Sequence, residues 1–151
     1  MRYFLDTEFN GYGGELISLA LVPEFGDQEY YAVLPISAEP HGWVQRNVLP
    51  YLASVPPGFV SEELPRTAVA RQIAHYLAAD SEPVIVADWP EDIAHFCNLL
   101  VTGPGDIAPV GSLKFEFISS PGFSTAENSR VPHNALHDAR ALRDFVLAAE
   151  A

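Results

Sequence analysis

Residues 2–9 read Arg-Tyr-Phe-Leu-Asp-Thr-Glu-Phe, an aromatic and apolar stretch that carries two acids, Asp6 and Glu8. Such a stretch is typical of a β-strand near the centre of a sheet. Because alternate side chains of a strand point to the same face, Asp6 and Glu8 are expected to project together. Two inward-facing carboxylates repel each other and lose hydration, and a hard cation such as Mg²⁺ or Mn²⁺ would neutralise them. The alternative, a solvated acid pair at a strand edge, stays open on these two residues alone.

Strand-like and helix-like segments follow along the rest of the chain. Apolar runs at 15–22 and 29–34 follow so closely that they predict an antiparallel meander with 2–9. The later pattern predicts helices over 43–49 and 65–79, a buried strand over 83–87, a helix over 90–100, a strand over 113–118 and a helix over 134–149. The glycine- and proline-rich residues 102–111 are expected to form a loop. The predicted fold class is α/β, with a five-stranded mixed sheet (three antiparallel strands, then β-α-β) flanked by helices.

Length and charge limit the domain count and the compartment. The chain has 151 residues, 8 of them basic and 20 acidic, so its net charge is −12. A single domain over 1–151 is expected at this length. The acidic balance argues against a basic surface that coats nucleic acid or membranes, but it permits an active site that contacts nucleic acid through cations. The lone cysteine, Cys97, favours a reducing, cytoplasmic setting, and the apolar run at 16–22 is too short to span a membrane.

A second candidate acid follows the predicted strand at 83–87. Asp92 falls in the first turns of the next helix, at the carboxyl edge of the sheet, where ligand sites of open α/β sheets gather. An acid there also suits the positive end of the helix dipole, so Asp92 alone does not establish a site. Asp88, at the end of the strand, is a competing candidate that also suits the N-cap position.

A third candidate group is His133-Asn-Ala-Leu-His-Asp138, at the start of the last predicted helix. Five residues along a regular helix are a rotation of about 140°, so His133 and Asp138 could not share a helix face. Pro132 and the loop before it predict that His133 precedes the helix and reaches a site that Asp138 enters from the first turns. A surface histidine and an ordinary helical aspartate are the alternative for either residue alone.

Taken in chain order, these three groups resemble the motifs of the DEDDh family of 3′–5′ exonucleases. The most specific part is His133-Asn-Ala-Leu-His-Asp-Ala-Arg-Ala-Leu142, and Asn134 departs from the Tyr-x3-Asp variant of the motif. The resemblance covers residues 6–142 and implies a ribonuclease H-like fold. The stretches 1–9, 15–18 and 43–50 look like the bacterial exoribonucleases of the RNase AS type, which trim adenylate-rich RNA and work as homodimers.

The resemblance implies a role for each site residue. Metal ligands are implied at Asp6, Glu8, Asp92 and Asp138, for two divalent cations, Mg²⁺ or Mn²⁺; Glu8 also counts among the catalytic residues, with His133 as general base. In many relatives the second motif reads Asn-x-x-Phe-Asp, whereas this chain has Asp88-Trp-Pro-Glu-Asp92. The register leaves Asp92 as the ligand and keeps Asp88 as the alternative.

The implied activity is that of a metal-dependent 3′–5′ exoribonuclease, which releases nucleoside 5′-monophosphates from single-stranded RNA 3′ ends. Phe9, just after Glu8, is the candidate for stacking on the terminal base, and a plain core role is its alternative. A 3′–5′ DNA exonuclease would use the same metal site, because only a contact to the 2′-OH separates the two substrates. A catalytically silent nucleic-acid-binding domain on the same fold is the other alternative.

Overall fold

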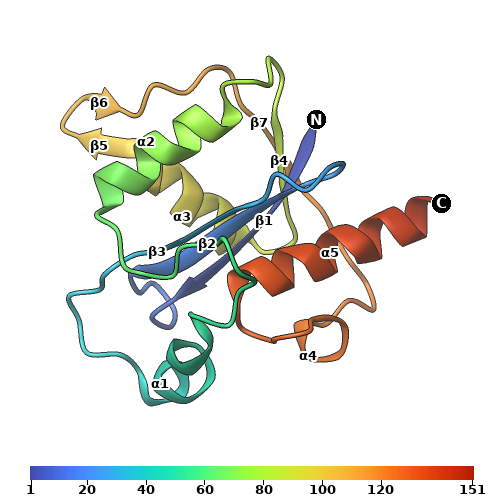
Figure 1. Cartoon of the computed structure of the whole chain (residues 1–151), viewed down its shortest axis with the longest axis horizontal. Helices are drawn as coiled ribbons and strands as arrows, with labels where there is room; N and C mark the ends of the chain where they lie inside the picture. Colours follow the sequence, from blue (N-terminus) through green and yellow to red (C-terminus); the bar gives the residue numbers. More distant parts are fainter.

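The computed structural model describes residues 1–151 and shows an α/β fold built around a five-stranded sheet (Figure 1). The strands, in the spatial order β3-β2-β1-β4-β7, are β1 (Arg2–Phe9), β2 (Leu16–Pro23), β3 (Tyr30–Val33), β4 (Val84–Ala87) and β7 (Lys114–Phe117). β1, β2 and β3 pair antiparallel, whereas β4 runs parallel to β1 and β7 runs parallel to β4. The predicted mixed sheet, with three antiparallel strands followed by β-α-β, is therefore confirmed.

Helices cover both faces of this sheet. α2 (Arg66–Leu77) and α3 (Pro90–Leu100) pack on one face, and α5 (Ala135–Glu150) packs on the other (Figure 1). The shorter helical elements are α1 (Gly42–Asn47), the 3₁₀ helix η1 (Leu49–Tyr51) and α4 (Thr125–Asn128). None of the helices combines the length and the apolar character needed to cross a bilayer.

The central strand β1 sends alternate side chains into two different core clusters. Leu5 packs in the larger cluster, which includes residues of α2 and α3. Phe4 points to the opposite face and packs against Leu142 of α5. Because side chains of a strand alternate, Asp6 and Glu8 lie on the Phe4 face, beneath α5. The alternation that builds the core thus also directs both acids toward the start of α5.

The segment 102–111 differs from the expected loop. Two strands, β5 (Val101–Gly103) and β6 (Asp106–Ile107), form a small antiparallel hairpin there. Gly105 has a left-handed φ of +68°, which only glycine adopts without strain, and this lets the chain reverse within a few residues. The loop prediction is wrong for these residues, because the glycines that signal an irregular segment also allow a tight turn.

Two other boundaries differ in detail from the predicted ones. The short helix expected over 43–49 is divided into α1 and η1, and Pro50 lies inside η1, where the missing N–H of proline is tolerated in the first turn. The segment before His133 also contains the single turn of α4, which the sequence pattern does not indicate.

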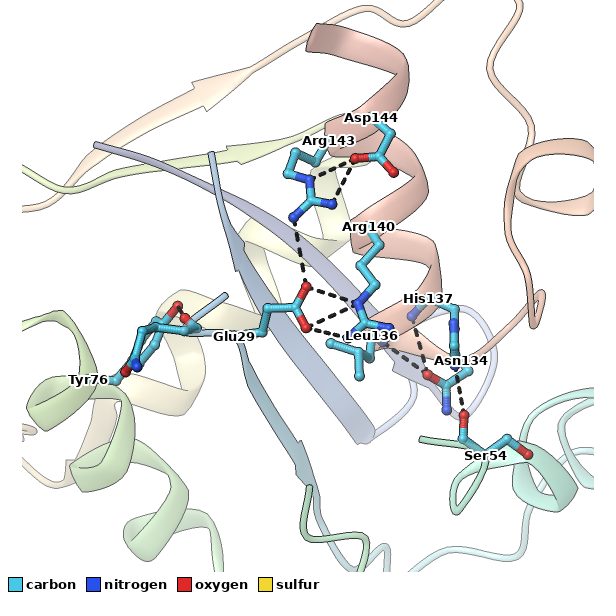
Figure 2. A network of polar contacts seen from close by, with 10 residues as sticks. Glu29, Ser54, Tyr76, Asn134, Leu136, His137, Arg140, Arg143 and Asp144 are labelled. Carbon is cyan, nitrogen blue, oxygen red and sulfur yellow. Dashed lines mark hydrogen bonds and ion pairs between the residues drawn. The ribbon is translucent and has the colours of Figure 1, made fainter. Parts of the chain in front are cut away.

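A buried asparagine fixes the start of α5 (Figure 2). Asn134 is the N-cap, and its Oδ1 accepts hydrogen bonds from the N–H groups of Leu136 at 3.1 Å and His137 at 3.4 Å. Its Nδ2 donates to the carbonyl of Tyr51 in η1 at 2.8 Å. The side chain therefore satisfies two free helix donors and ties α5 to η1 at the same time.

A second set of polar contacts holds the side of α5 against the residue that precedes β3 (Figure 2). The carboxylate of Glu29 is 8% exposed and accepts from the guanidinium of Arg140, with an Nε–Oε1 distance of 2.9 Å. Arg143 lies 3.8 Å from the same carboxylate. Since both arginines belong to α5, the position of the helix over the sheet depends on this ion-pair group as well as on apolar packing.

Replacement of Asn134 by alanine is expected to lower the free energy of unfolding by about 1–2 kcal/mol, the usual effect of losing a helix N-cap. The variant loses all three hydrogen bonds of the side chain at a fully buried position. Urea unfolding followed by circular dichroism measures the change. Asn98→Ala, an exposed position in α3, is the control and should change stability by less than about 0.5 kcal/mol. Equal effects of the two substitutions would contradict the capping role.

Candidate metal centre

A cleft of about 680 Å³ opens at the carboxyl ends of β1 and β4. All of the residues that the sequence indicated line this cleft, namely Asp6, Glu8, Phe9, Asp92, His133 and Asp138, and so does the alternative ligand Asp88. Because β1 and β4 are parallel neighbours, their carboxyl ends meet at one edge of the sheet. The start of α5 reaches the same edge of the sheet. Here α5 lies on one face of β1 and α3 lies on the other.

The two acids of β1 lie where regular pairing of the strand ends. Glu8 is opposite Ser18 of β2, but Phe9 is opposite Leu16, so the register shifts between Glu8 and Phe9. A bulge of this kind bends a strand and increases its twist, which changes the direction of the side chains that follow. Glu8 is buried, and Oδ2 of Asp6 is enclosed by protein.

His133 precedes α5, as the sequence predicts, and its backbone conformation is unusual. Its φ of +65° makes it the one non-glycine residue of the chain in the left-handed region. That conformation lets the His133 N–H donate to Oδ2 of Asp138 at 3.0 Å. The imidazole meets the indole of Trp43 edge-on, with ring centroids 4.8 Å apart. Glu8, His133 and Asp138 each offer one atom that could bind a metal ion, and these three atoms lie within 4.8 Å of one another.

Asp92 and Asp88, the two candidate ligands of the second motif, accept hydrogen bonds from different partners. Asp92 is buried in the first turn of α3, and its Oδ1 accepts from the N–H of Thr7 at 3.2 Å and from its hydroxyl at 2.6 Å. Asp88 accepts from the hydroxyl of Ser120 at 2.7 Å. Two bonds from the central strand fix Asp92 relative to Asp6 and Glu8, whereas Asp88 is tied to the loop after β7.

Burial raises the pKa of every carboxyl in the group. The pKa is raised to about 8 for Glu8, to about 7 for Asp92 and to about 6 for Asp138, and that of Asp6 lies well above its usual range. Loss of hydration is the largest cause in each case, and for Asp6 and Glu8 the negative charges of the neighbouring acids add to it. Without a counter-charge, the cluster therefore resists full ionisation near neutral pH.

Two oxygens of the cluster have no hydrogen-bond partner although they are buried: Oδ2 of Asp6 and Oδ1 of Asp138. Buried polar atoms in native proteins almost always have a partner, and such exceptions indicate a group that the protein itself does not supply. Mg²⁺ and Mn²⁺ prefer carboxylate oxygen ligands, which are the donors of Asp6, Glu8, Asp92 and Asp138. The residues present thus fit a divalent cation.

Aromatic side chains surround the acids. No sequence motif identifies most of these aromatic residues as part of the site. Tyr12, Trp43 and Trp89 line the cleft while remaining 96%, 50% and 56% exposed. Phe9 also lines it and contacts the ring of His95, with centroids 4.7 Å apart. No lysine or arginine lines the cleft. An anionic ligand would therefore meet aromatic surface and carboxylates, with no basic side chain of the cleft to attract it.

No protein-family model matches the chain, and no curated protein matches its sequence. The functional assignment therefore depends on the geometry and the chemistry of the cleft.

In the absence of divalent cations, we expect the free energy of unfolding to fall as the pH rises from about 6.5 to about 8.5. The folded-state pKa values of Asp92, about 7, and Glu8, about 8, lie above those of the unfolded chain. Their neutral forms thus stabilise the fold fully below the unfolded pKa, and this contribution is lost as the pH rises through the folded values. Urea unfolding in EDTA measures the loss, and added Mg²⁺ or Mn²⁺ should reverse most of it at high pH.

Glu8→Gln should flatten this pH dependence, because the amide does not titrate. Glu24→Gln is the control: the hydrogen bond from Arg2 lowers the pKa of Glu24, so its titration ends below this pH range. Burial lowers the pKa of His133 and His137, which keeps their titration out of the range as well. An unchanged slope in Glu8→Gln would contradict the buried-acid interpretation.

Proposed function

We propose that this chain is a metal-dependent 3′–5′ exoribonuclease with a ribonuclease H-like fold, acting on the 3′ end of single-stranded RNA. The observation that carries the proposal is a cleft whose lining includes four acids and one histidine in the chain order of DEDDh exonucleases: Asp6, Glu8, Asp92, His133 and Asp138. These side chains come from three separate segments of the chain. Gathering four carboxyls in a buried site is unfavourable for stability alone, so a functional reason is favoured.

The four carboxyls are the proposed ligands of two Mg²⁺ or Mn²⁺ ions. When bound, the ions supply Lewis acidity, which lowers the pKa of a water molecule and stabilises charge on the departing 3′ oxygen. Two divalent cations balance the charge of the four proposed ligand carboxylates, while Asp88 and Glu91 add negative charge to the lining of the same cleft. Because the cleft contains no lysine or arginine, its own side chains repel a phosphate, and the cations would supply the positive charge that attracts it. Substrate binding would thus depend on the cation.

His133 is the proposed general base. Burial lowers its pKa, so the imidazole is neutral at pH 7 and able to accept a proton. Glu8, His133 and Asp138 each place one oxygen or nitrogen atom within 4.8 Å of the other two. A point between these three atoms is at hydrogen-bond distance from all of them. A water molecule at that point would be oriented by the two carboxylates and could give its proton to the imidazole. The contact with Trp43 holds the ring at this side of the cleft.

The shape of the cleft favours attack at a chain end. Its volume of about 680 Å³ is that of a small-molecule site and suits a terminal nucleotide better than a continuous strand. The rings of Phe9, Tyr12, Trp43 and Trp89 offer surfaces on which a base can stack without a specific hydrogen-bond pattern. The same features suit a DNA 3′ end, so the substrate test includes both nucleic acids.

Linear single-stranded RNA with a 5′ label should lose nucleoside 5′-monophosphates stepwise from its 3′ end in Mg²⁺ or Mn²⁺, and remain intact in EDTA. Denaturing electrophoresis of the labelled products and chromatography of the released nucleotides provide the measurement. A circular RNA of the same sequence should resist cleavage, because it presents no end to the cleft. Cleavage of the circle would overturn the proposal, faster digestion of DNA would favour the DNA exonuclease, and no cleavage of either would favour a silent binding domain.

Two matched substitutions test the assignment of the second-motif ligand. Asp92→Asn should reduce cleavage to background, since it removes a carboxylate that Thr7 positions beside Asp6 and Glu8. Asp88→Asn removes the same charge from the same cleft and should retain most of the activity. The reverse ranking would assign the ligand role to Asp88.

His133→Asn should lower kcat by about 10²–10⁴, the usual loss when a proton-transfer group is removed. Asparagine is the chosen replacement because it tolerates a left-handed φ, so the backbone contact to Asp138 can persist. Mn²⁺ should still raise the melting temperature of this variant, whereas it should not do so for Asp138→Asn. His137→Asn is the control on the same segment, and an equal loss of kcat there would exclude a special role for His133.

A further inference from the structure

Basic side chains, which are scarce in this chain, gather beside α5. Three of the 8 lysines and arginines, namely Arg130, Arg140 and Arg143, line one hollow of about 570 Å³. Arg140 and Arg143 follow one another along the same side of α5 (Figure 2). Three acids line this hollow as well, but Glu29 already accepts from Arg140, and Asp144 accepts from Arg143. The hollow thus offers an anion more positive charge than the metal-binding cleft, which has no basic side chain.

A second hollow, of about 540 Å³, connects this one with the cleft. It shares Arg130 with the arginine-lined hollow and His133 with the cleft. No acid lines it, and its other lining residues are uncharged: Asn47, Tyr51, Ser54, Val131 and Pro132. An anionic chain that leaves the cleft past His133 therefore meets Arg130 and no carboxylate in this hollow. The two hollows together are called the arginine groove below.

Two arginines of the groove keep hydrogen-bond donors that the chain does not use. Arg130 is exposed and forms no ion pair. Arg140 donates to Glu29 through Nε and Nη2, which leaves its Nη1 free for another acceptor. Guanidinium groups bind phosphate well, because their planar set of donors matches the phosphate oxygens. The free donors of the groove thus suit a phosphate.

Aromatic rings accompany these arginines. Tyr51 lines the smaller hollow and is 42% exposed, and Phe59 lines the larger one. The guanidinium of Arg140 lies over the ring of Phe59, 5.9 Å from its centroid. A positively charged groove with aromatic rings is the combination by which proteins hold single-stranded nucleic acid without reading its sequence.

Another hollow adjoins the cleft through Glu91, and it is less suited to a phosphate chain. Its one arginine, Arg66, is accompanied by the carboxyls of Glu15 and Glu91. Like charges raise the energy of an anion there. A strand that leaves the cleft is therefore favoured to follow the arginine groove.

We propose that the arginine groove binds the phosphodiester backbone of RNA just 5′ of the nucleotide in the cleft. The inference rests on the proposed exoribonuclease function, in which the 3′ end lies among the acids and the rest of the strand leads outward past His133. Arg130 contacts the first phosphate outside the cleft, Tyr51 stacks on a base beside it, and Arg140 contacts a later phosphate. The groove supplies an attraction that the cleft lacks, so longer RNA binds better than a dinucleotide.

Arg130→Gln should raise the KM for a single-stranded RNA of about twelve nucleotides by about five- to ten-fold and leave kcat unchanged, because the lost contact is the same in the ground state and the transition state. The KM for a dinucleotide should not change, since its only phosphate lies in the cleft. Arg71→Gln, at an exposed position of α2, and Arg66→Gln are the matched controls and should leave both KM values unchanged. Arg130 has no ion pair to lose, so the fold should persist, as circular dichroism will show.

Binding without turnover separates the groove from the chemistry of the cleft. In EDTA, the same RNA with a fluorophore at its 5′ end should bind in an anisotropy titration, and log Kd should rise linearly with log salt concentration. Arg130→Gln should lower this slope by about 0.7, the usual effect of losing one phosphate contact to a single strand. Tyr51→Ala should weaken binding at least about five-fold and leave the slope unchanged, because it removes a stacked base and no charge.

The groove and the exoribonuclease activity would fail in different ways. Normal cleavage of RNA, with a KM and a salt slope that Arg130→Gln does not alter, would overturn the groove and leave the exoribonuclease proposal intact. RNA that binds through Arg130 in EDTA but is never cleaved in Mg²⁺ or Mn²⁺ would support the groove and refute the exoribonuclease. An equal rise in the KM for the dinucleotide, or a larger effect of Arg66→Gln, would also overturn the groove.

Discussion

The burial of like charges at the end of the central strand is the constraint on which the rest of the structure depends. Asp6 and Glu8 share a strand face with Phe4, so the alternation that forms the core also brings two carboxyls beneath α5. Buried carboxylates are strongly unfavourable unless charge or hydrogen bonds compensate them. The fold limits this penalty by placing the acids at the edge of the sheet, where a cleft opens, and not under the middle of the helix.

The protein compensates the acids only in part, with hydrogen bonds donated by two residues, Thr7 and His133. Thr7 of β1 bonds to Asp92 of α3, and the N–H of His133 bonds to Asp138 of α5. These hydrogen bonds link Asp92 to the central strand and Asp138 to the residue before its own helix, so both carboxyls are held in place without being neutralised. An arginine in the cleft would have stabilised the metal-free fold, but it would also have competed with a cation for the same oxygens.

Much of the sheet and the membership of the cluster could be predicted from the sequence, for identifiable reasons. The shared face of Asp6 and Glu8 follows from the two-residue period of a strand, and the place of His133 before α5 follows from Pro132. The bonds between Thr7 and Asp92 depend on how α3 docks against β1, which local patterns do not encode. Exposed aromatics such as Trp89 are also indistinguishable in sequence from buried ones, so the rim of the cleft could not be predicted.

The left-handed backbone of His133 places stability and chemistry in opposition at a single position. Glycine would adopt that conformation without strain and keep the N–H that bonds to Asp138, yet it would remove the imidazole from the cleft. A β-branched residue would lose both, since it fits the left-handed region worst. Glycine at this position would thus relieve backbone strain, whereas only histidine provides the imidazole that the proposed general base requires.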